Sequence, residues 1–282
     1  MRMTRTEFLA WPKKAVTLLG MSGVGKTYLA NKLPKTSWFH YSGDYRLGTK
    51  YLAEPILDNI KRQAMQIDFL RDLLRSDSIY IANNISVHNL EPISTFLGKI
   101  GRVDLGGLPL SEFKRRQHLH LEAEAAAMSD VGDFIHKAHE IYGYDNFLND
   151  AGGSICELPA GESLQVLRAS TLILYLRAGP DTEQKLIERA ASDPKPLYFC
   201  ESFLDRKLAD YLSAEGLKTA EEIEPNHFVR WIFPHLLEHR RPLYEAIAER
   251  DGYTVDAAEL EQIEGEQDFI EFVADAIERK HG

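Results

Sequence analysis

Residues 15–27 read AVTLLGMSGVGKT, and this stretch decides the fold of the chain. Its first five residues form a short apolar run with β-branched members at Val16 and Thr17, as is typical of a buried strand. Residues 20–27 then match the pattern GxxxxGK[ST] in full, and YLANKL follows before Pro34. A strand, a glycine-rich loop and a helix in this order predict a P-loop, which holds the phosphates of a nucleoside triphosphate.

Each residue type in this loop has a chemical reason. Glycines let the loop curl until its backbone N–H groups point at phosphate oxygens, and the following helix adds the partial positive charge of its N-terminus. We expect Lys26 to reach the β- and γ-phosphates as a catalytic cation, and Thr27 to bind Mg²⁺. The predicted nucleotide-binding residues are Gly20, Met21, Ser22, Gly23, Val24, Gly25, Lys26, Thr27 and Tyr28.

Four further segments have the composition of strands, namely 37–42, 145–150, 171–176 and 253–255. Segments with helical spacing of apolar residues alternate with them. This alternation predicts an α/β protein with a three-layer P-loop NTPase or kinase core, in which helices cover a mostly parallel five-stranded sheet. Ligands bind such sheets at the carboxyl ends of the strands, so residues that follow the strands are the candidates for a site.

About a hundred residues separate the second and third predicted strands, which is too many for a structureless loop. We therefore expect a helical insertion over 53–141, serving as a substrate-side subdomain, with one long helix at 112–128. Residues 1–52 and 142–282 would form the kinase core.

A helical region after the fourth strand, residues 181–250, is expected to form a lid that closes over the site. Prolines should break it at positions 194, 196, 225 and 234. The tail predicts a last amphipathic helix with Phe269, Phe272, Val273, Ala276 and Ile277 facing inward.

The second predicted strand leads into Asp44, on the expected acceptor side of the phosphates. A carboxylate there is expected to accept or orient the proton of a substrate hydroxyl, which makes Asp44 a catalytic and substrate-binding candidate. A helix-capping or turn aspartate, common after glycine, is the alternative. Arg46 would pair with Asp44 or with a substrate anion, or else lie solvated on the surface.

The third predicted strand ends at Asp150, where P-loop proteins place a carboxylate that holds Mg²⁺ directly or through water. A plain strand-ending turn is the alternative. Gly152 and Gly153 follow at once and would let a substrate approach the backbone closely. Glu157 is a further candidate near the same magnesium.

Composition narrows the class of protein. The formal net charge of −10 argues against a chain that coats nucleic acid or an anionic membrane. The basic run at 114–116 is therefore interpreted as a solvated helix face. Cys156 and Cys200 fit no metal-ligand spacing, and the histidines offer no third ligand for zinc. The absence of an apolar N-terminal stretch or a long apolar run predicts a cytoplasmic protein outside the membrane.

The glycine loop resembles that of small-molecule P-loop kinases, and the chain is most similar to shikimate kinases. Asp44 matches the aspartate that this family places after its second strand to hold substrate hydroxyls. Residues 150–153, Asp-Ala-Gly-Gly, resemble the family's glycine-rich substrate loop. Residues 240–248, RRPLYEAIA, are similar to its R-x-P-L-Y-x-x-x-A segment, whose leading arginine grips an anionic substrate group and falls on Arg240.

The chain also departs from this family. The small enzymes have no counterpart of the helical insertion, and the arginine of their lid is replaced by lysine at position 195. The resemblance therefore implies the kinase architecture rather than the substrate. The alternative for residues 240–248 is that Pro242, Leu243 and Tyr244 simply start and pack a helix.

These features together predict an ATP- and Mg²⁺-dependent phosphotransferase whose partner is a small, anionic acceptor with a hydroxyl group. One alternative is a nucleotide-dependent regulatory ATPase or switch without an acceptor. A GTPase is not indicated, because the guanine-reading motif N-K-x-D does not occur in the sequence. The other alternative is a nucleic-acid end kinase, but the net negative charge of the chain argues against it.

Overall fold

The computed structural model of the chain describes residues 1–159 and 161–281. Five strands form one sheet in the order β2-β3-β1-β4-β5, and every neighbouring pair is parallel. Their bounds are β1 (Ala15–Leu19), β2 (Trp38–Ser42), β3 (Asn146–Asp150), β4 (Leu172–Arg177) and β5 (Gly252–Asp256). All five predicted strands are thus confirmed to within one residue at each end.

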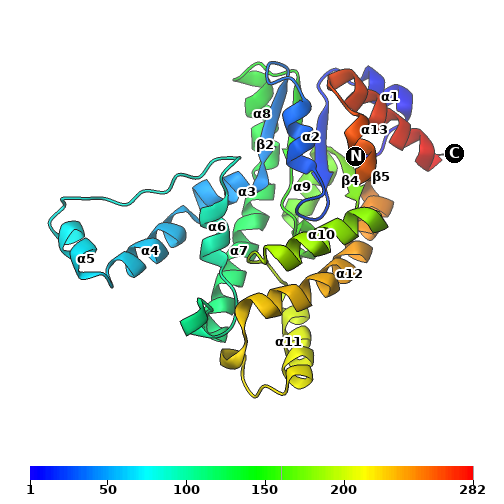
Figure 1. Ribbon diagram of the computed structural model, residues 1–282. Helices are drawn as coiled ribbons and strands as arrows, with labels where there is room; N and C mark the ends of the chain where they lie inside the picture. Colours follow the sequence, from blue (N-terminus) through cyan, green and yellow to red (C-terminus); the bar gives the residue numbers. More distant parts are fainter. Residues whose placement is uncertain (160, 282) are drawn as a thin grey trace. The chain divides into compact units, whose positions relative to one another are not determined.

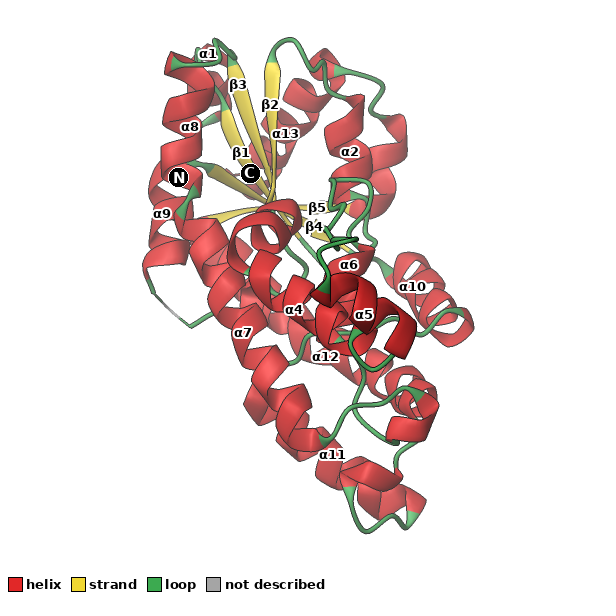
Figure 2. Ribbon diagram, turned by 90° about the vertical axis from the view of Figure 1, so that its left-hand side faces the viewer, coloured by secondary structure: helices red, strands yellow, loops and turns green. Residues whose placement is uncertain are grey.

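Helices cover both faces of this sheet, as Figures 1 and 2 show. On one face, Tyr41 of β2 packs against Phe134 of α8, and α9 contacts β4. On the other face, α2 contacts β3, and Trp38 of β2 packs against Phe269 of α13. The predicted α/β architecture is therefore present, with an all-parallel sheet between two layers of helix.

Thirteen α-helices occur among the described residues, joined by short 3₁₀ and π turns. They are α1 (Arg5–Ala10), α2 (Lys26–Lys32), α3 (Gly43–Arg46), α4 (Ala53–Ala64), α5 (Asp68–Arg75), α6 (Glu91–Leu97), α7 (Leu110–Ser129), α8 (Val131–Glu140), α9 (Glu162–Ser170), α10 (Pro180–Ser192), α11 (Glu201–Glu215), α12 (Pro225–Asp251) and α13 (Glu266–His281). The predicted long helix at 112–128 is confirmed as α7. In the predicted tail helix, now α13, Phe269, Val273, Ala276 and Ile277 are buried, and Phe272 is half-buried.

The chain divides into two compact units. The first consists of Met1–Gly43, Glu124–Pro194 and Arg230–Gly282, and it contains the whole sheet. The second consists of Asp44–Ala123 and Lys195–Val229. These bounds differ from the expected insertion at 53–141. Packing explains part of the difference, because α8 contacts β2 and β3 and therefore belongs with the sheet.

The expectation that Pro234 breaks the helical region was wrong. Helix α12 continues through both Pro234 and Pro242, whereas Pro194 and Pro196 do lie between helices and Pro225 opens α12. A proline inside a helix removes one hydrogen bond. The burial of Ile232 and Leu236, which are fully shielded from solvent, stabilises the helix across that position.

Across the described residues, no helix combines the length and the apolar character needed to cross a membrane.

Candidate functional site

The glycine loop joins β1 to α2 and has a conformation that requires its glycines. Gly25 directly precedes α2 with a φ of 105°, a value that side chains disfavour. Gly20 has a φ of 147°, and a Cβ atom there would lie 2.8 Å from the carbonyl oxygen of Leu176 in β4. The loop therefore lies close against the neighbouring strand, at the carboxyl edge of the sheet.

Lys26 folds back over this loop. Its Nζ donates hydrogen bonds to the carbonyl oxygens of Gly20, at 2.8 Å, and of Met21, at 3.1 Å. Only 7% of the residue is exposed, so a cation is held at the carboxyl end of β1 where little water surrounds it. An ammonium in this position favours the binding of phosphate oxygens.

Thr27 and Asp150 meet directly, although 123 positions separate them. The hydroxyl of Thr27 donates a hydrogen bond of 2.5 Å to Oδ2 of Asp150. Asp150 ends β3, in register with Leu18 of β1 and Ser42 of β2, and it is buried. The structure thus brings together the two residues that the sequence predicted as magnesium ligands.

The charge of Asp150 is stabilised by its neighbours. Burial raises the pKa of this carboxyl, but His40, Lys26 and Thr27 together outweigh burial and hold the pKa below its ordinary value. Asp150 is therefore ionised at neutral pH. A hydroxyl and a buried carboxylate are oxygen ligands of the kind that Mg²⁺ prefers.

His40 is a site residue that the sequence interpretation missed. Its Nε2 lies 3.6 Å from Oδ2 of Asp150. The signal was present in the alternation of β2, because His40 lies two positions before Ser42, the register partner of Asp150. The two side chains therefore share a face of the sheet, but this inference needs the register, which the sequence does not show.

Gly153 lies against the glycine loop. A Cβ atom on Gly153 would overlap the side chain of Ser22 and lie 2.8 Å from its backbone nitrogen. Gly152, just before it, is buried. The loop after β3 therefore packs directly on the glycine loop, as expected for residues at the ends of adjacent parallel strands.

Arg240 projects from α12 and is 4% exposed. Its Nε and Nη2 donate to Oε2 of Glu157 at 2.9 and 2.5 Å, and its Nη1 donates to the carbonyl oxygen of Gly153 at 2.8 Å. The sequence led us to expect contacts of Arg240 with an acceptor anion. In the structure this guanidinium forms an ion pair within the protein.

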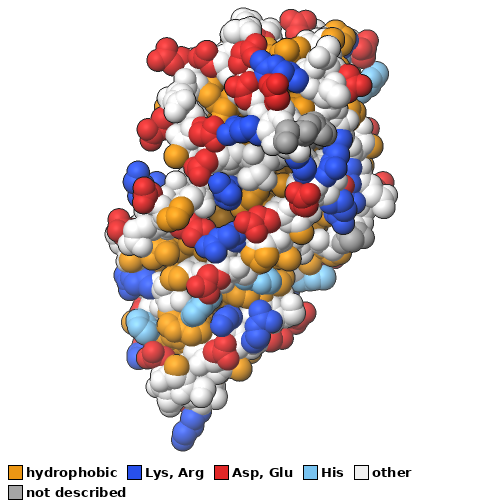
Figure 3. All heavy atoms as spheres, turned by 90° about the vertical axis from the view of Figure 1, so that its right-hand side faces the viewer, with side chains coloured by type: hydrophobic (Ala, Val, Ile, Leu, Met, Phe, Trp, Pro, Cys, Tyr) orange, Lys and Arg blue, Asp and Glu red, His pale blue; other side chains and the backbone are white. Residues whose placement is uncertain are grey.

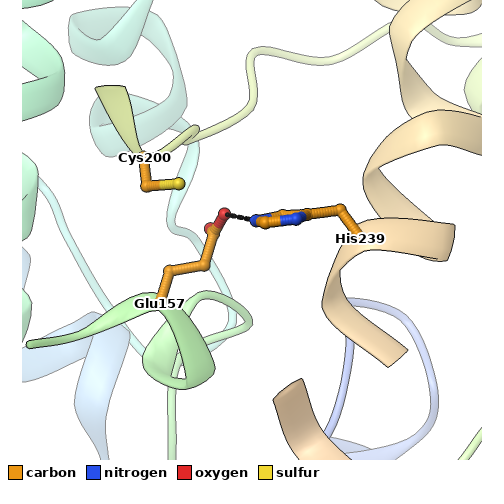
Figure 4. A group of neighbouring side chains, drawn as sticks. All are labelled: Glu157, Cys200 and His239. Atoms are coloured by element: carbon orange, nitrogen blue, oxygen red, sulfur yellow. Dashed lines mark ion pairs between the residues drawn. The ribbon is translucent and has the colours of Figure 1, made fainter. Parts of the chain in front are cut away.

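Glu157 also lies next to His239, which precedes Arg240 in α12. Nε2 of His239 is 3.1 Å from Oε1 of Glu157, and the side chain of Glu157 is fully shielded from solvent. Figure 4 shows the imidazole facing the carboxylate; Cys200, also drawn there, belongs to the second unit. Glu157, expected near the magnesium, is thus placed in contact with α12.

Tyr244 gives α12 a further contact with the glycine loop. Its hydroxyl donates a hydrogen bond of 3.2 Å to the carbonyl oxygen of Gly20, and its ring stacks on that of Tyr175 in β4. Burial raises the pKa of this phenol, which therefore stays protonated and able to donate.

The other predicted residues lie as follows. Tyr28 is 56% exposed, and the ammonium of Lys32 lies 4.5 Å from the centre of its ring. Asp44 and Arg46 lie in α3 directly after β2, and both belong to the second unit. The guanidinium of Arg46 lies 5.9 Å from the ring centre of Tyr51 in that unit.

The expectation of a solvated basic face at 114–116 was wrong for Arg116. This residue is 6% exposed, and its guanidinium donates to Oδ1 of Asn59, to the carbonyl oxygen of Phe96 and to Glu112. Arg115 remains exposed. Helical spacing places Arg116 on a different side of α7 from its neighbour, and packing within the second unit buries that side.

No protein-family model matches this chain, and no curated protein matches it.

Proposed function

We propose that the protein is an ATP- and Mg²⁺-dependent phosphotransferase that moves the γ-phosphoryl group to a hydroxyl of a small, anionic metabolite. The observation that carries this proposal is the hydrogen bond between Thr27 and Asp150 beside the buried ammonium of Lys26. A complete glycine loop supplies backbone donors at the same edge of the sheet. These are the groups that phosphoryl transfer needs, since its catalysis is mostly positioning and charge stabilisation.

Mg²⁺ is part of the proposal because the donor set fits it. Thr27 and Asp150 would hold the ion, and bound magnesium would neutralise charge that develops on the phosphate oxygens. Lys26 would bind the terminal phosphates as a second positive charge. His40 would support the orientation of Asp150 from the neighbouring strand.

In the proposed reaction, an oxygen of the acceptor hydroxyl attacks the γ-phosphorus while the bond from phosphorus to the β,γ-bridging oxygen breaks. ADP leaves, and the carboxylate of Asp44 takes the proton of the hydroxyl. Asp44 follows β2, whose end is in register with Asp150 through Ser42. Arg46 and the backbone at Gly152 and Gly153 would contribute to acceptor binding.

The distribution of surface charge supports a small acceptor over a polynucleotide. Figure 3 shows acidic and basic side chains interspersed on the face that it draws, rather than a basic stripe. Such a surface does not favour binding of a polynucleotide. We place the enzyme in the cytoplasm, in keeping with its two free cysteines.

Transfer of labelled phosphate tests the proposal. The protein is incubated with Mg²⁺ and γ-labelled ATP, together with mixtures of small carboxylated or phosphorylated alcohols. We expect label in an organic phosphate, and Asp44→Asn should lower kcat by about 100-fold or more while ATP affinity stays near that of the parent, because an amide cannot take up the proton.

Release of label only as inorganic phosphate, at the same rate in the Asp44→Asn variant, would instead support a regulatory ATPase. Label incorporated into the end of an oligonucleotide would support a nucleic-acid end kinase. Either result would overturn the proposal of a small-molecule acceptor.

A further inference from the structure

Helix α12 supports the glycine loop through two sets of contacts within the first unit, one direct and one through Gly153. Tyr244 bonds directly to the carbonyl oxygen of Gly20, at the start of the loop. Arg240, one helical turn earlier, bonds to the carbonyl oxygen of Gly153, and Gly153 lies against Ser22. The same helix therefore supports two positions of the glycine loop, Gly20 directly and Ser22 through Gly153.

The orientation of Arg240 is set by Glu157. Two of its nitrogens bind a single carboxylate oxygen, and the carboxylate is fully shielded from solvent. Burial lowers the pKa of this guanidinium, but its neighbours, with Glu157 the largest contributor, together outweigh burial and raise the pKa. His239 contacts the other oxygen of Glu157. The remaining edge of the guanidinium is thereby directed at Gly153.

Gly153 links the position of Arg240 to that of the glycine loop because it lacks a side chain. With a Cβ atom it would overlap Ser22, so the peptide at Gly153 can lie this close to the glycine loop only as glycine. Its contact with Ser22 involves backbone, and a backbone contact of this kind adjusts less easily than one between flexible side chains.

We infer that Arg240 is a positioning residue for the nucleotide: held by Glu157, it seats the Gly152–Gly153 loop on Ser22 and so keeps the glycine loop in its binding conformation. This inference rests on the proposed function. It assigns Arg240 to the nucleotide side of the site, whereas the family likeness implies contact with the acceptor. The two roles predict different kinetic changes.

The test is the variant Arg240→Lys, with Arg241→Lys as its matched control. A lysine at 240 offers a point charge and cannot bind Glu157 and Gly153 with one planar fork. Arg241 also forms a two-nitrogen ion pair, but with Glu183 of α10 instead of the loop at Gly153. We expect Mg·ADP to bind Arg240→Lys about 10- to 100-fold more weakly in calorimetric titration, and Arg241→Lys to bind it as the parent does.

A second measurement needs no nucleotide. Hydrogen exchange of the backbone amides at residues 20–24 should become faster in Arg240→Lys than in the parent, and Arg241→Lys should leave it unchanged. If the parent binds no nucleotide, faster exchange there still supports the positioning role, and only the proposed function fails. Unchanged exchange at 20–24 would overturn the inference even if nucleotide affinity fell.

Gly153→Ala tests the same contact while leaving the ion pair of Arg240 and Glu157 in place. It should weaken Mg·ADP binding and speed exchange at 20–24, because the added methyl group pushes the loop away from Ser22. If Arg240→Lys does not fold, Gly153→Ala alone tests the inference. Parental affinity and exchange in Gly153→Ala, or a rise in acceptor KM alone in Arg240→Lys, would contradict the positioning role.

Discussion

At the scale of single residues, Asp150 holds a negative charge where only 5% of the residue is exposed. A carboxylate in such a place is stable only with charged or hydrogen-bonding neighbours. Thr27 donates to it, and Lys26 and His40 lie close enough to lower its pKa against the effect of burial. The charge is therefore kept beside the glycine loop, where we propose that a magnesium ion binds.

Replacing Asp150 by asparagine keeps an oxygen that can accept from Thr27 but removes this charge. We expect the gain in ADP affinity that Mg²⁺ produces to fall by about 10- to 100-fold, while affinity measured without Mg²⁺ changes little. Titration of ADP with and without Mg²⁺ measures both quantities. Asp145→Asn, an exposed position just before the same strand, is the control. A magnesium effect of parental size in Asp150→Asn would rule out the assigned role.

At the scale of elements, hydrogen bonds of a buried arginine hold α7 against neighbouring helices of the second unit. Arg116 bonds to Asn59 of α4 and to the end of α6 at Phe96, and Glu112 on the preceding turn of α7 accepts from it. Hydrogen bonds from Arg115 lower the pKa of Glu112 to about 2, with Arg116 contributing and partial burial opposing. One carboxylate thus supports the contacts among three helices.

This shift predicts how acid affects stability. The folded-state pKa of Glu112 lies below its ordinary value of 4.5, so its contribution is present above about pH 4.5 and is lost as the pH falls toward 2. Glu112→Gln should lower the free energy of unfolding by on the order of 1 kcal/mol at pH 7. The variant should also lose less stability than the parent as the pH falls from 4.5 to 2.

Thermal unfolding across this pH range measures the effect. Glu122→Gln is the control on the same helix, because Glu122 pairs with His118 at the exposed surface. An acid dependence in Glu112→Gln as steep as that of the parent would show that the ion pair contributes nothing to stability.

At the scale of the whole molecule, the sheet unit contains the glycine loop and the second unit contains Asp44. The base specificity of such a protein depends on residues outside the glycine loop, and the guanine-reading motif N-K-x-D does not occur in the sequence. We therefore expect ATP to be preferred to GTP. Competition of unlabelled ATP and GTP against labelled ATP measures the preference, and tighter binding of GTP by about tenfold would contradict it.

Local sequence patterns determined much of this protein. Five strands and the glycine loop could be predicted because the patterns that indicate them, apolar runs and the GxxxxGK[ST] spacing, each span only a few neighbouring residues. Thr27 and Asp150 could be proposed as partners because the carboxyl ends of parallel strands meet at one edge of a sheet. These inferences need only the type and order of the elements.

Other features were decided by the tertiary structure alone. The position of His40 beside Asp150 depends on the register of β2 against β3, and the ion pair of Arg240 with Glu157 joins residues 83 positions apart. Helix α12 passes through Pro234 because burial of its apolar side outweighs a lost hydrogen bond. Burial, register and partner choice arise only when distant segments pack, so no local pattern in the sequence encodes them.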